Sequence, residues 1–385
     1  MTRAAGDWER WTSDRLAAIR DQGRWRAHRR FDALGPRGQV TVDGPEGPVA
    51  RDVVSFASND YLGLSFHPAV VAAAHEALDR WGAGAGASRL VTGDRPVHDD
   101  LEREIASWKA TQRAVLFPTG YAANLGVLAT LGDAGVLICS DELNHASIID
   151  GTRLARAEVA VHPHGDLEAL DRILAAAGDR PAMVVADTVF SMDGDQADLV
   201  GLADRCRRHG ALLVLDEAHA VLGPDPAADC FDGVEVVRVG TLSKTLGSLG
   251  GFAACSARVA DLLVNAARTQ IFTTGSSPAD AAGGLAALRV LRSAEGQELK
   301  SRLRAHVERL RPGHPSPIVP IVLGPEEAAV AASGALLERG LWVPAIRPPT
   351  VPPGTSRLRV TFSAAHTDDE VSRLLDALAE LGALA

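Results

Sequence analysis

Short apolar runs recur along most of the chain and alternate with stretches whose apolar residues have helical spacing. The clearest runs cover residues 114–117, 136–139, 183–186, 212–215 and 236–239. Each run is continuous rather than alternating with polar residues, which is typical of strands covered on both faces. Strands that alternate with helices predict an α/β domain with a mostly parallel sheet, and we place this large domain at residues 51–290.

The pattern changes after about residue 290. Residues 318–322 predict a strand, 326–339 a helix, and 357–362 a strand with alternating apolar positions. Residues 367–370 form a capping-box sequence, after which the apolar residues again have helical spacing. We therefore expect residues 291–385 to form a smaller α+β domain whose sheet has one exposed face.

The first 50 residues are rich in Arg and Trp. The amphipathic stretch at residues 11–19 predicts a helix, and the sequence Asp-Gly-Pro-Glu-Gly at residues 43–47 predicts a turn. We expect residues 1–50 to form a separate N-terminal segment that is mainly helical.

Composition narrows the classes of function. The 385 residues can build a large core, and the net charge of −10 disfavours binding to nucleic acid or an anionic membrane through bulk charge. No apolar run approaches the roughly 20 residues that cross a bilayer. The N-terminus lacks the apolar segment of a signal peptide, so we expect a cytoplasmic protein. The four cysteines form no Cys-x-x-Cys pair, which disfavours zinc and redox sites.

Lys244 follows the last of these apolar runs, in the sequence Thr-Leu-Ser-Lys-Thr-Leu-Gly. A lysine at the end of a buried strand loses its proton more easily than a solvated one, and the neutral amine attacks aldehydes. By itself this position is more typical of a solvated lysine, so the interpretation depends on the residues that accompany it.

Polar residues follow the other predicted strands, at the edge of the sheet where ligands bind in open α/β folds. Gly120 and Tyr121 lie in a turn before a predicted helix at residues 122–131, whose first N–H groups suit a phosphate, although a plain strand-to-helix turn has the same pattern. His145 follows the next strand and is either a ring-stacking residue or a hydrogen-bonded loop histidine. Ser191 follows the third.

Asp216 and His219 follow the fourth strand. An aspartate held there can keep a pyridine nitrogen protonated, and a histidine three residues later can reach the adjacent phenolic oxygen. The pair could instead bind a metal, but no third ligand has suitable spacing, so we expect no metal site. A lysine, a strand-end aspartate, a stacking histidine and a phosphate-binding turn are together the requirements of pyridoxal phosphate.

Five segments resemble the α-oxoamine synthase family in their order and spacing. They are residues 59–64, 86–93, 191–195, 216–219 and 241–247. These enzymes have the fold type I of pyridoxal-phosphate-dependent transferases, condense an amino acid with an acyl thioester, and release carbon dioxide. Residues 345–359 are most similar to members that use L-alanine and a pimeloyl thioester in biotin biosynthesis, whereas sister enzymes use glycine or serine with another acyl-CoA.

The resemblance implies a role for each matching residue. Lys244 forms the Schiff base and removes the Cα proton, Asp216 pairs with the pyridine nitrogen, His219 approaches the ring hydroxyl, and His145 stacks on the ring and donates a proton. The other cofactor contacts are Gly120, Tyr121, Ser191, Thr241, Thr273 and Thr274, of which the last two act across a homodimer interface. The substrate contacts are Arg26, Asn59, His145, Arg347 and Thr350, with Arg347 on the amino-acid carboxylate.

Other readings of the same residues stay open. An aminotransferase or aldolase on this fold would lack the full order of motifs, and a non-catalytic partner subunit would lack Lys244 and Asp216. The acyl carrier is coenzyme A or acyl carrier protein. Five arginines near the N-terminus are either a docking site for a protein carrier or an ordinary solvated face; they are Arg20, Arg24, Arg26, Arg29 and Arg30. The loop at residues 82–88 has alanines where relatives often have glycine or serine, which restricts its backbone.

Overall fold

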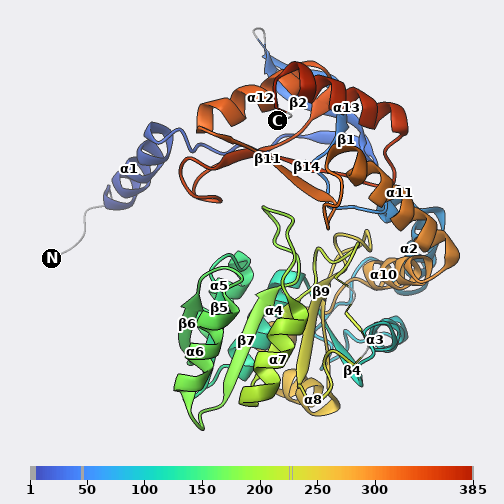
Figure 1. Ribbon diagram of the computed structural model, residues 1–385. Helices are drawn as coiled ribbons and strands as arrows, with labels where there is room; N and C mark the ends of the chain where they lie inside the picture. The colour runs from blue at the N-terminus through green and yellow to red at the C-terminus, as the bar shows by residue number, and fades with distance from the viewer. Residues whose placement is uncertain (1–5, 45–46, 225, 228, 384–385) are drawn as a thin grey trace.

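The computed structural model describes residues 6–44, 47–224, 226–227 and 229–383. The chain forms two lobes, with helices α2, α10 and α11 at one side between them and helix α1 projecting from the other side (Figure 1). The lower lobe holds the large sheet, and the upper lobe combines the C-terminal part of the chain with strands from its beginning.

The large sheet has seven strands in the order β4-β10-β9-β8-β7-β5-β6, and only β10 is antiparallel to its neighbours. Its strands are β4 (Arg113–Phe117), β5 (Leu137–Asp141), β6 (Glu158–His162), β7 (Ala182–Asp187), β8 (Leu212–Asp216), β9 (Val236–Thr241) and β10 (Gly251–Cys255). The prediction of a mostly parallel α/β sheet is confirmed. Strands β6 and β10 were not predicted, because β6 is an edge strand with exposed positions and β10 consists mainly of small residues.

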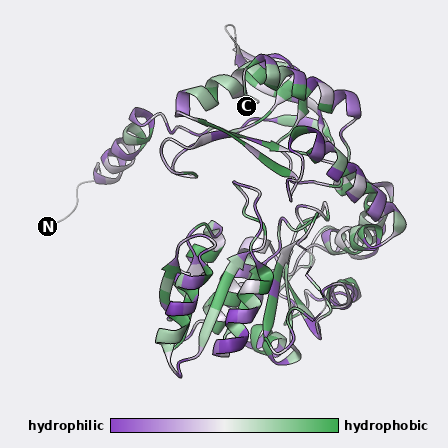
Figure 2. Cartoon of the chain, in the orientation of Figure 1, coloured by the Kyte–Doolittle hydropathy of each residue, from purple (hydrophilic) through white to green (hydrophobic). Residues whose placement is uncertain are grey.

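Helices cover both faces of this sheet, as the continuous apolar runs predict. Met183 and Val185 on β7 pack with residues of α4 and α8, whereas Val184 and Ala186 pack with residues of α6 and α7. The helices of this lobe are α3 (Pro96–Trp108), α4 (Gly120–Leu131), α5 (Ala146–Leu154), α6 (Leu167–Ala177), α7 (Leu199–His209), α8 (Ala257–Ala266), α9 (Arg268–Ile271), and, at its side, α2 (Pro68–Trp81) and α10 (Pro278–Leu291). Figure 2 shows apolar strands between helices with polar outer faces.

The C-terminal part of the chain forms a three-stranded antiparallel sheet, β11-β14-β13, covered by helices. Its elements are α11 (Ala294–Leu310), β11 (Ile318–Gly324), α12 (Glu326–Glu338), β12 (Leu341–Trp342), β13 (Ala345–Ile346), β14 (Ser356–Thr361) and α13 (Asp368–Glu380). The predicted capping box is present, since Thr367 Oγ1 accepts from the backbone of Glu370 and the Glu370 carboxylate accepts from that of Thr367.

One expectation for this sheet was wrong. All six residues of β14 are buried, although the alternating sequence predicted an exposed face. The polar positions of the strand are buried because Arg357 and Arg359 reach across to Asp193 and to the carbonyl of Ser191 in the other lobe.

The N-terminal segment differs from the expected helical unit. Helix α1 (Asp7–Asp21) is present, but β1 (Phe31–Leu34), β2 (Arg37–Gly44) and β3 (Gly47–Ser55) follow it. Alternating residues such as Val40 and Val53 pack on Leu337 of α12, and β3 pairs in parallel with β12. The turn predicted at residues 43–47 lies partly outside the described residues. The N-terminal strands thus belong to the upper lobe, while the division of the chain at residues 50 and 290 stays a prediction.

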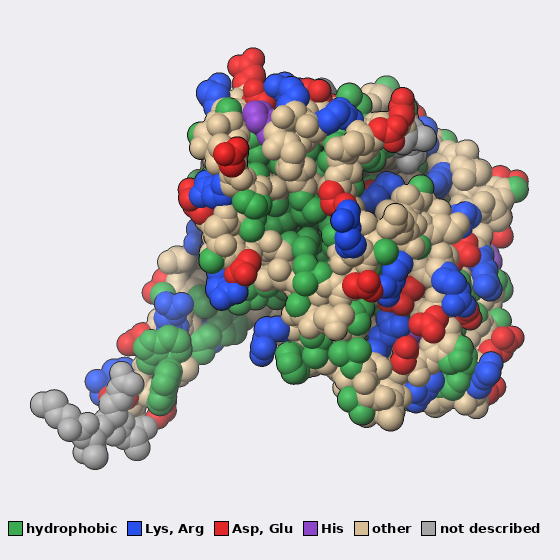
Figure 3. All heavy atoms as spheres, turned by 90° about the horizontal axis from the view of Figure 1, so that it is seen from below, with side chains coloured by type: hydrophobic (Ala, Val, Ile, Leu, Met, Phe, Trp, Pro, Cys, Tyr) green, Lys and Arg blue, Asp and Glu red, His purple; other side chains and the backbone are tan. Residues whose placement is uncertain are grey.

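Helix α1 buries none of its residues and exposes an apolar face. Trp8 and Trp11 are 67% and 54% exposed, and Leu16 and Ile19 lie further along the helix. Hydrophobic side chains on this helix continue onto the adjoining underside of the molecule (Figure 3). Among the described residues, no helix combines the length and the apolar character needed to cross a membrane.

Candidate active site

The carboxyl ends of β8 and β9 bring together the central residues predicted from the sequence. Lys244 Nζ lies 2.8 Å from His219 Nε2 in the loop after β9. Asp216 ends β8, where its Oδ1 accepts from the backbone N–H of Ala218 at 2.9 Å. Asp216 and His219 are buried and Lys244 is half-buried, so the three groups share an environment that is largely shielded from water.

The burial of Lys244 favours a reactive amine. Burial lowers the pKa of Lys244, and Arg359 lowers it further, while Asp216 and Asp187 oppose this shift. Burial also lowers the pKa of His219 well below its ordinary value, and the nearby Lys244 and Arg359 add to the effect. His219 is therefore neutral at physiological pH, and Lys244 is more easily deprotonated than a solvated lysine.

Helix α4 begins beside this cluster. Thr119 caps it by accepting from the backbone of Ala122 at 3.0 Å, and the first N–H groups of a helix have no partner within it. Gly120 packs so closely that an added Cβ would lie 3.1 Å from Cβ of Thr241. The N-terminus of α4 therefore lies directly against β9, while the roles of Gly120, Tyr121 and Thr241 stay predictions.

A buried asparagine, which the sequence analysis did not select, joins the carboxylate to the predicted stacking histidine. Asn124 Nδ2 donates to Oδ2 of Asp216 at 2.6 Å and to Oγ of Ser147 at 2.8 Å. Ser147 Oγ lies 2.7 Å from Nδ1 of His145. This chain fixes His145 relative to Asp216, and the edge of Tyr121 faces the His145 ring at 6.4 Å between centroids. In the sequence, the one feature that could have identified Asn124 is that it is an amide within a mostly apolar helix.

Arg359 is a second residue that the sequence analysis missed. Its side chain is buried and donates to the carbonyl of Ser191 at 2.6 Å, to Oδ1 of Asn59 at 3.3 Å and to Oγ1 of Thr361 at 3.0 Å. Its neighbour Arg357 pairs with Asp193. Among the described residues, no carboxylate forms an ion pair with Arg359, so its charge is available to an anionic ligand.

The remaining predicted site residues lie outside the cluster around Lys244. Arg347 donates to the carbonyl of Gly23 at 2.5 Å and lies 3.9 Å from Glu326. Arg26 and Thr350 are exposed. Thr273 and Thr274 line a small hollow with Phe117 and Pro118 at the end of β4. Within the described chain, none of these five residues forms a hydrogen bond or ion pair with the amine, and their roles stay predictions.

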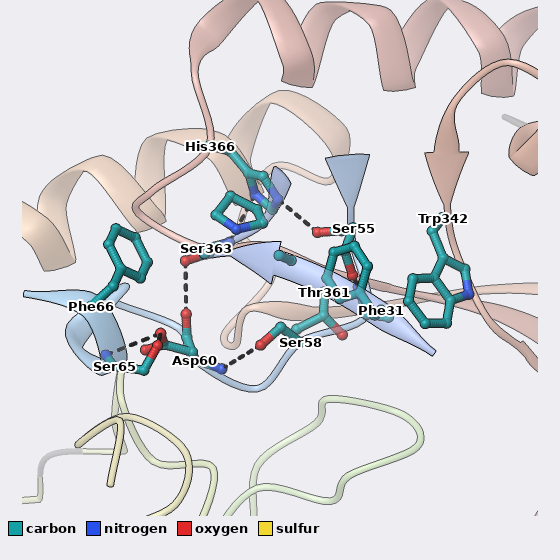
Figure 4. A pocket seen from close by; sticks show the side chains of 14 residues that line it. Phe31, Ser55, Ser58, Asp60, Ser65, Phe66, Trp342, Thr361, Ser363 and His366 are labelled. Carbon is teal, nitrogen blue, oxygen red and sulfur yellow. Dashed lines mark hydrogen bonds between the residues drawn. The ribbon is translucent and has the colours of Figure 1, made fainter. Parts of the chain in front are cut away.

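A cavity of about 420 Å³ lies beside the loop that carries Asn59 (Figure 4). Phe31, Phe66 and Trp342 form its aromatic walls. Its polar groups mainly hold the loop: the Asp60 carboxylate accepts from the backbone of Leu64 and from Ser65, and Ser363 donates to the carbonyl of Asp60 at 2.7 Å. The lining contains no Lys or Arg, so the cavity does not suit a phosphate.

The residues present fit pyridoxal phosphate. A half-buried amine with a lowered pKa, a strand-end carboxylate, a neutral histidine and the N-terminus of α4 lie near one another at the edge of the sheet. Gly120 adds no side chain at that helix end, which favours the close approach of a phosphate.

Comparisons with known proteins agree with this geometry. The family model described as aminotransferase class I and II matches residues 51–378. A curated 8-amino-7-oxononanoate synthase of Burkholderia thailandensis is 45% identical over 94% of this chain and 95% of its own length. One of Methylobacterium nodulans is 48% identical over 86% of this chain and 88% of its own length.

Solved structures show the same fold. Serine palmitoyltransferase from S. paucimobilis, with pyridoxal phosphate and myriocin bound, superposes with a TM-score of 0.87 at 29% identity, covering 99% of this chain and all of that one. The 8-amino-7-oxononanoate synthase of Francisella tularensis gives a TM-score of 0.70 at 25% identity, covering 85% of this chain and 97% of that one. The expected fold type I is confirmed.

Proposed function

The chain belongs to the 8-amino-7-oxononanoate synthases of the class I and II aminotransferase family, and we propose that it condenses L-alanine with a pimeloyl thioester. The products are 8-amino-7-oxononanoate, carbon dioxide and the free carrier thiol, in biotin biosynthesis. The observation that carries this proposal is the half-buried amine of Lys244, which lies 2.8 Å from His219 at the same edge of the sheet as Asp216.

Pyridoxal phosphate, when bound, supplies an aldehyde to the amine and a ring that stabilises negative charge at Cα. Lys244 would hold the aldehyde carbon, Asp216 the ring nitrogen, and the N-terminus of α4 the phosphate. Ser191, Thr241, Thr273 and Thr274 would complete the site, the last two from a second copy of the chain.

Lys244 and the histidines around it would move the protons. When it is not bonded to the cofactor, the neutral amine of Lys244 would take the proton from Cα. Burial lowers the pKa of His145, so its ring is neutral. Its Nδ1 accepts from the backbone of Ser147 at 3.2 Å, which leaves the proton on Nε2. His145 thus donates a hydrogen bond to the oxygen of the acyl group during its attack.

Arg359 with Asn59 is better placed than Arg347 to bind the alanine carboxylate. Arg359 is buried and already contacts Asn59, whereas Arg347 is partly exposed and bonded to Gly23. A guanidinium without an acidic partner in a shielded site binds a carboxylate strongly. Arg347, Thr350 and Arg26 then lie further out, where the acyl donor enters.

A second copy of the chain would complete the molecule. The apolar face of α1 has no partner within the described chain, and such a face on a projecting helix favours an interface between subunits. We propose a homodimer in the cytoplasm. Within the exposed N-terminal segment, Arg20 stacks on Trp25 at 4.0 Å. The neighbouring arginines of this segment would contact the acyl carrier protein or coenzyme A.

The proposal is tested with purified protein and added pyridoxal phosphate. We expect a visible absorbance band that shifts with L-alanine but not with glycine or L-serine, and formation of 8-amino-7-oxononanoate from alanine and a pimeloyl thioester, followed by mass spectrometry. Turnover with glycine or serine and another acyl-CoA would instead identify a sister synthase. Parallel kinetics with pimeloyl-CoA and pimeloyl acyl carrier protein identify the carrier.

A further inference from the structure

A buried tyrosine contacts the histidine that lies beside Lys244, on the opposite side of the imidazole ring. Tyr61 has no solvent exposure, and its hydroxyl lies 2.5 Å from Nδ1 of His219. The same hydroxyl lies 3.2 Å from Oδ1 of Asn59, which also accepts from Arg359. One side chain therefore joins the group beside the Schiff-base lysine to the pair proposed to bind the substrate carboxylate.

Counting donors fixes the direction of these hydrogen bonds. The phenol has a single proton, because burial raises the pKa of Tyr61 to about 12 against the opposing effect of Arg359. Oδ1 of Asn59 can only accept, so it must receive that proton. The contact with His219 is then satisfied only if Nδ1 of the neutral imidazole donates to the phenol oxygen. His219 consequently carries its proton on Nδ1, and Nε2 is left as a bare acceptor facing Lys244 Nζ.

We infer that Tyr61 is a positioning residue, which fixes the tautomer of His219 so that an unprotonated Nε2 faces the amine of Lys244. The inference rests on the proposed function only for the role of Lys244 as the cofactor lysine. Nε2 then accepts a hydrogen bond from the ammonium of Lys244 at 2.8 Å, and it stabilises that charged form against the burial that disfavours it.

The surroundings hold Tyr61 in place for this role. Its loop is fixed by the Asp60 carboxylate, which accepts from Leu64 at 2.9 Å, and by Ser363, which donates to the Asp60 carbonyl. A contact with the upper lobe also holds the backbone of Tyr61, since its carbonyl accepts from the backbone N–H of Ala364 at 2.8 Å. The hydroxyl therefore has little freedom to seek another acceptor.

The charges facing this pair come from several elements. Asp216 and Asp187 favour the ammonium of Lys244, whereas Arg359 opposes it. His219 is influenced by Lys244, Arg359 and His145. Replacing Tyr61 by Phe changes none of these charges and keeps the ring, so its effect on proton positions isolates the hydroxyl.

The direct test is ¹⁵N NMR of the full chain with labelled histidine, in which His219→Asn assigns the His219 signals. We expect a non-protonated Nε2 in the wild type. In Tyr61→Phe, the Nδ1 proton loses its acceptor, and we expect the proton to move to Nε2. A protonated Nε2 in the wild type, or an unchanged tautomer in the variant, would overturn the inference, and neither result depends on turnover.

A second variant and a second readout guard against misfolding. Asn59→Ala frees the Tyr61 proton to point at Nδ1, so it should also place a proton on Nε2; an unchanged tautomer there contradicts the inference. The pH midpoint for the reaction of Lys244 with pyridoxal phosphate should fall by about one unit in Tyr61→Phe, because Nε2–H donates to the neutral amine. An unchanged or higher midpoint argues for a merely structural tyrosine.

The chain offers a matched control, because it contains only one other tyrosine. Tyr121 bonds through its hydroxyl to Asp150 at the surface and not to His219. Tyr121→Phe removes an equal group and should leave the His219 tautomer as it is in the wild type. If Tyr121→Phe and Tyr61→Phe move the proton equally, the hydroxyl of Tyr61 has no special role.

Discussion

Arg359 and Asn59 come from opposite ends of the chain, yet Nη2 of Arg359 donates to Oδ1 of Asn59 at 3.3 Å. The arginine is buried and has no carboxylate partner among the described residues, which is costly unless an anion binds there during function. The contact thus points to the place where the charge of the amino-acid substrate is neutralised.

Arg359→Lys should weaken alanine binding more than Arg347→Lys. Lysine keeps the charge but loses the two-pronged geometry of the guanidinium, so we expect the KM for alanine to rise about 10- to 100-fold with a smaller change in kcat. Arg347→Lys serves as the matched comparison in steady-state kinetics. A larger rise in the Arg347 variant would return the carboxylate to the residue that the sequence predicted.

Lys244→Ala should bind pyridoxal phosphate without a covalent bond. We expect borohydride treatment to fix the cofactor in the wild type but not in this variant, as followed by mass spectrometry, and turnover to fall to background. Lys300→Ala, which replaces a lysine on α11, is the control and should be labelled like the wild type. Retained turnover in Lys244→Ala would refute the role of Lys244.

Much of this site was predictable because each residue lies at the end of a recognisable strand. The runs that end at Asp216 and before Lys244 are buried on both faces, and parallel strands bring their carboxyl ends to one edge. Arg359 and Tyr61 reach the site from the other lobe and its adjoining loop, so the sequence around them does not predict that they belong to the site. Asn124 was not predicted, because a residue in a mostly apolar helix is expected to pack in the core and not to contact a ligand.

The N-terminal strands illustrate a different limit. Polar and apolar residues alternate at residues 37–42, as in a half-buried strand. The amphipathic pattern of the preceding residues is stronger, and it predicts a segment that is mainly helical. The strand that joins this sheet from the C-terminal part, β12, pairs with β3 and has only two residues. Such a short strand forms through the tertiary packing of Val53 and Leu337, which a sequence pattern cannot supply.

Glu217→Gln should destabilise the protein strongly. The Glu217 carboxylate is buried and accepts from Lys109 Nζ and Arg238 Nε, each at 2.6 Å. Removing its charge leaves two cations in a shielded place, so we expect the free energy of unfolding to fall by about 3–5 kcal/mol. Urea denaturation of Glu217→Gln and of the exposed control Glu235→Gln measures this; equal losses in both would contradict it.

The same carboxylate should make the wild type sensitive to acid. Burial raises the pKa of Glu217, but Lys109 and Arg238 outweigh it, and the net shift is downward from 4.5. Its contribution is therefore complete above pH 4.5 and is lost as the pH falls through the lower pKa of the folded state. Between pH 7 and pH 3, unfolding free energy should fall less in Glu217→Gln than in the wild type.

Trp11→Ser combined with Trp8→Ser should weaken self-association. Both rings are mostly exposed on the projecting helix, so their loss costs the isolated chain little. We expect sedimentation equilibrium to show a dimer for the wild type and a shift toward monomer for the double variant. Asp14→Asn, on the same helix, should behave as the wild type. A monomeric wild type would refute the proposed homodimer.

The pairing of β3 with β12 also governs when the enzyme can become complete during its synthesis. β3 leaves the ribosome early, whereas β12 and the strand that carries Arg359 leave near the end. The large sheet lies between them in sequence and can assemble first. A nascent chain would therefore display Lys244 on a formed sheet before the loop of Asn59 has its partners, and the edge of β3 that pairs with β12 would stay open throughout that interval.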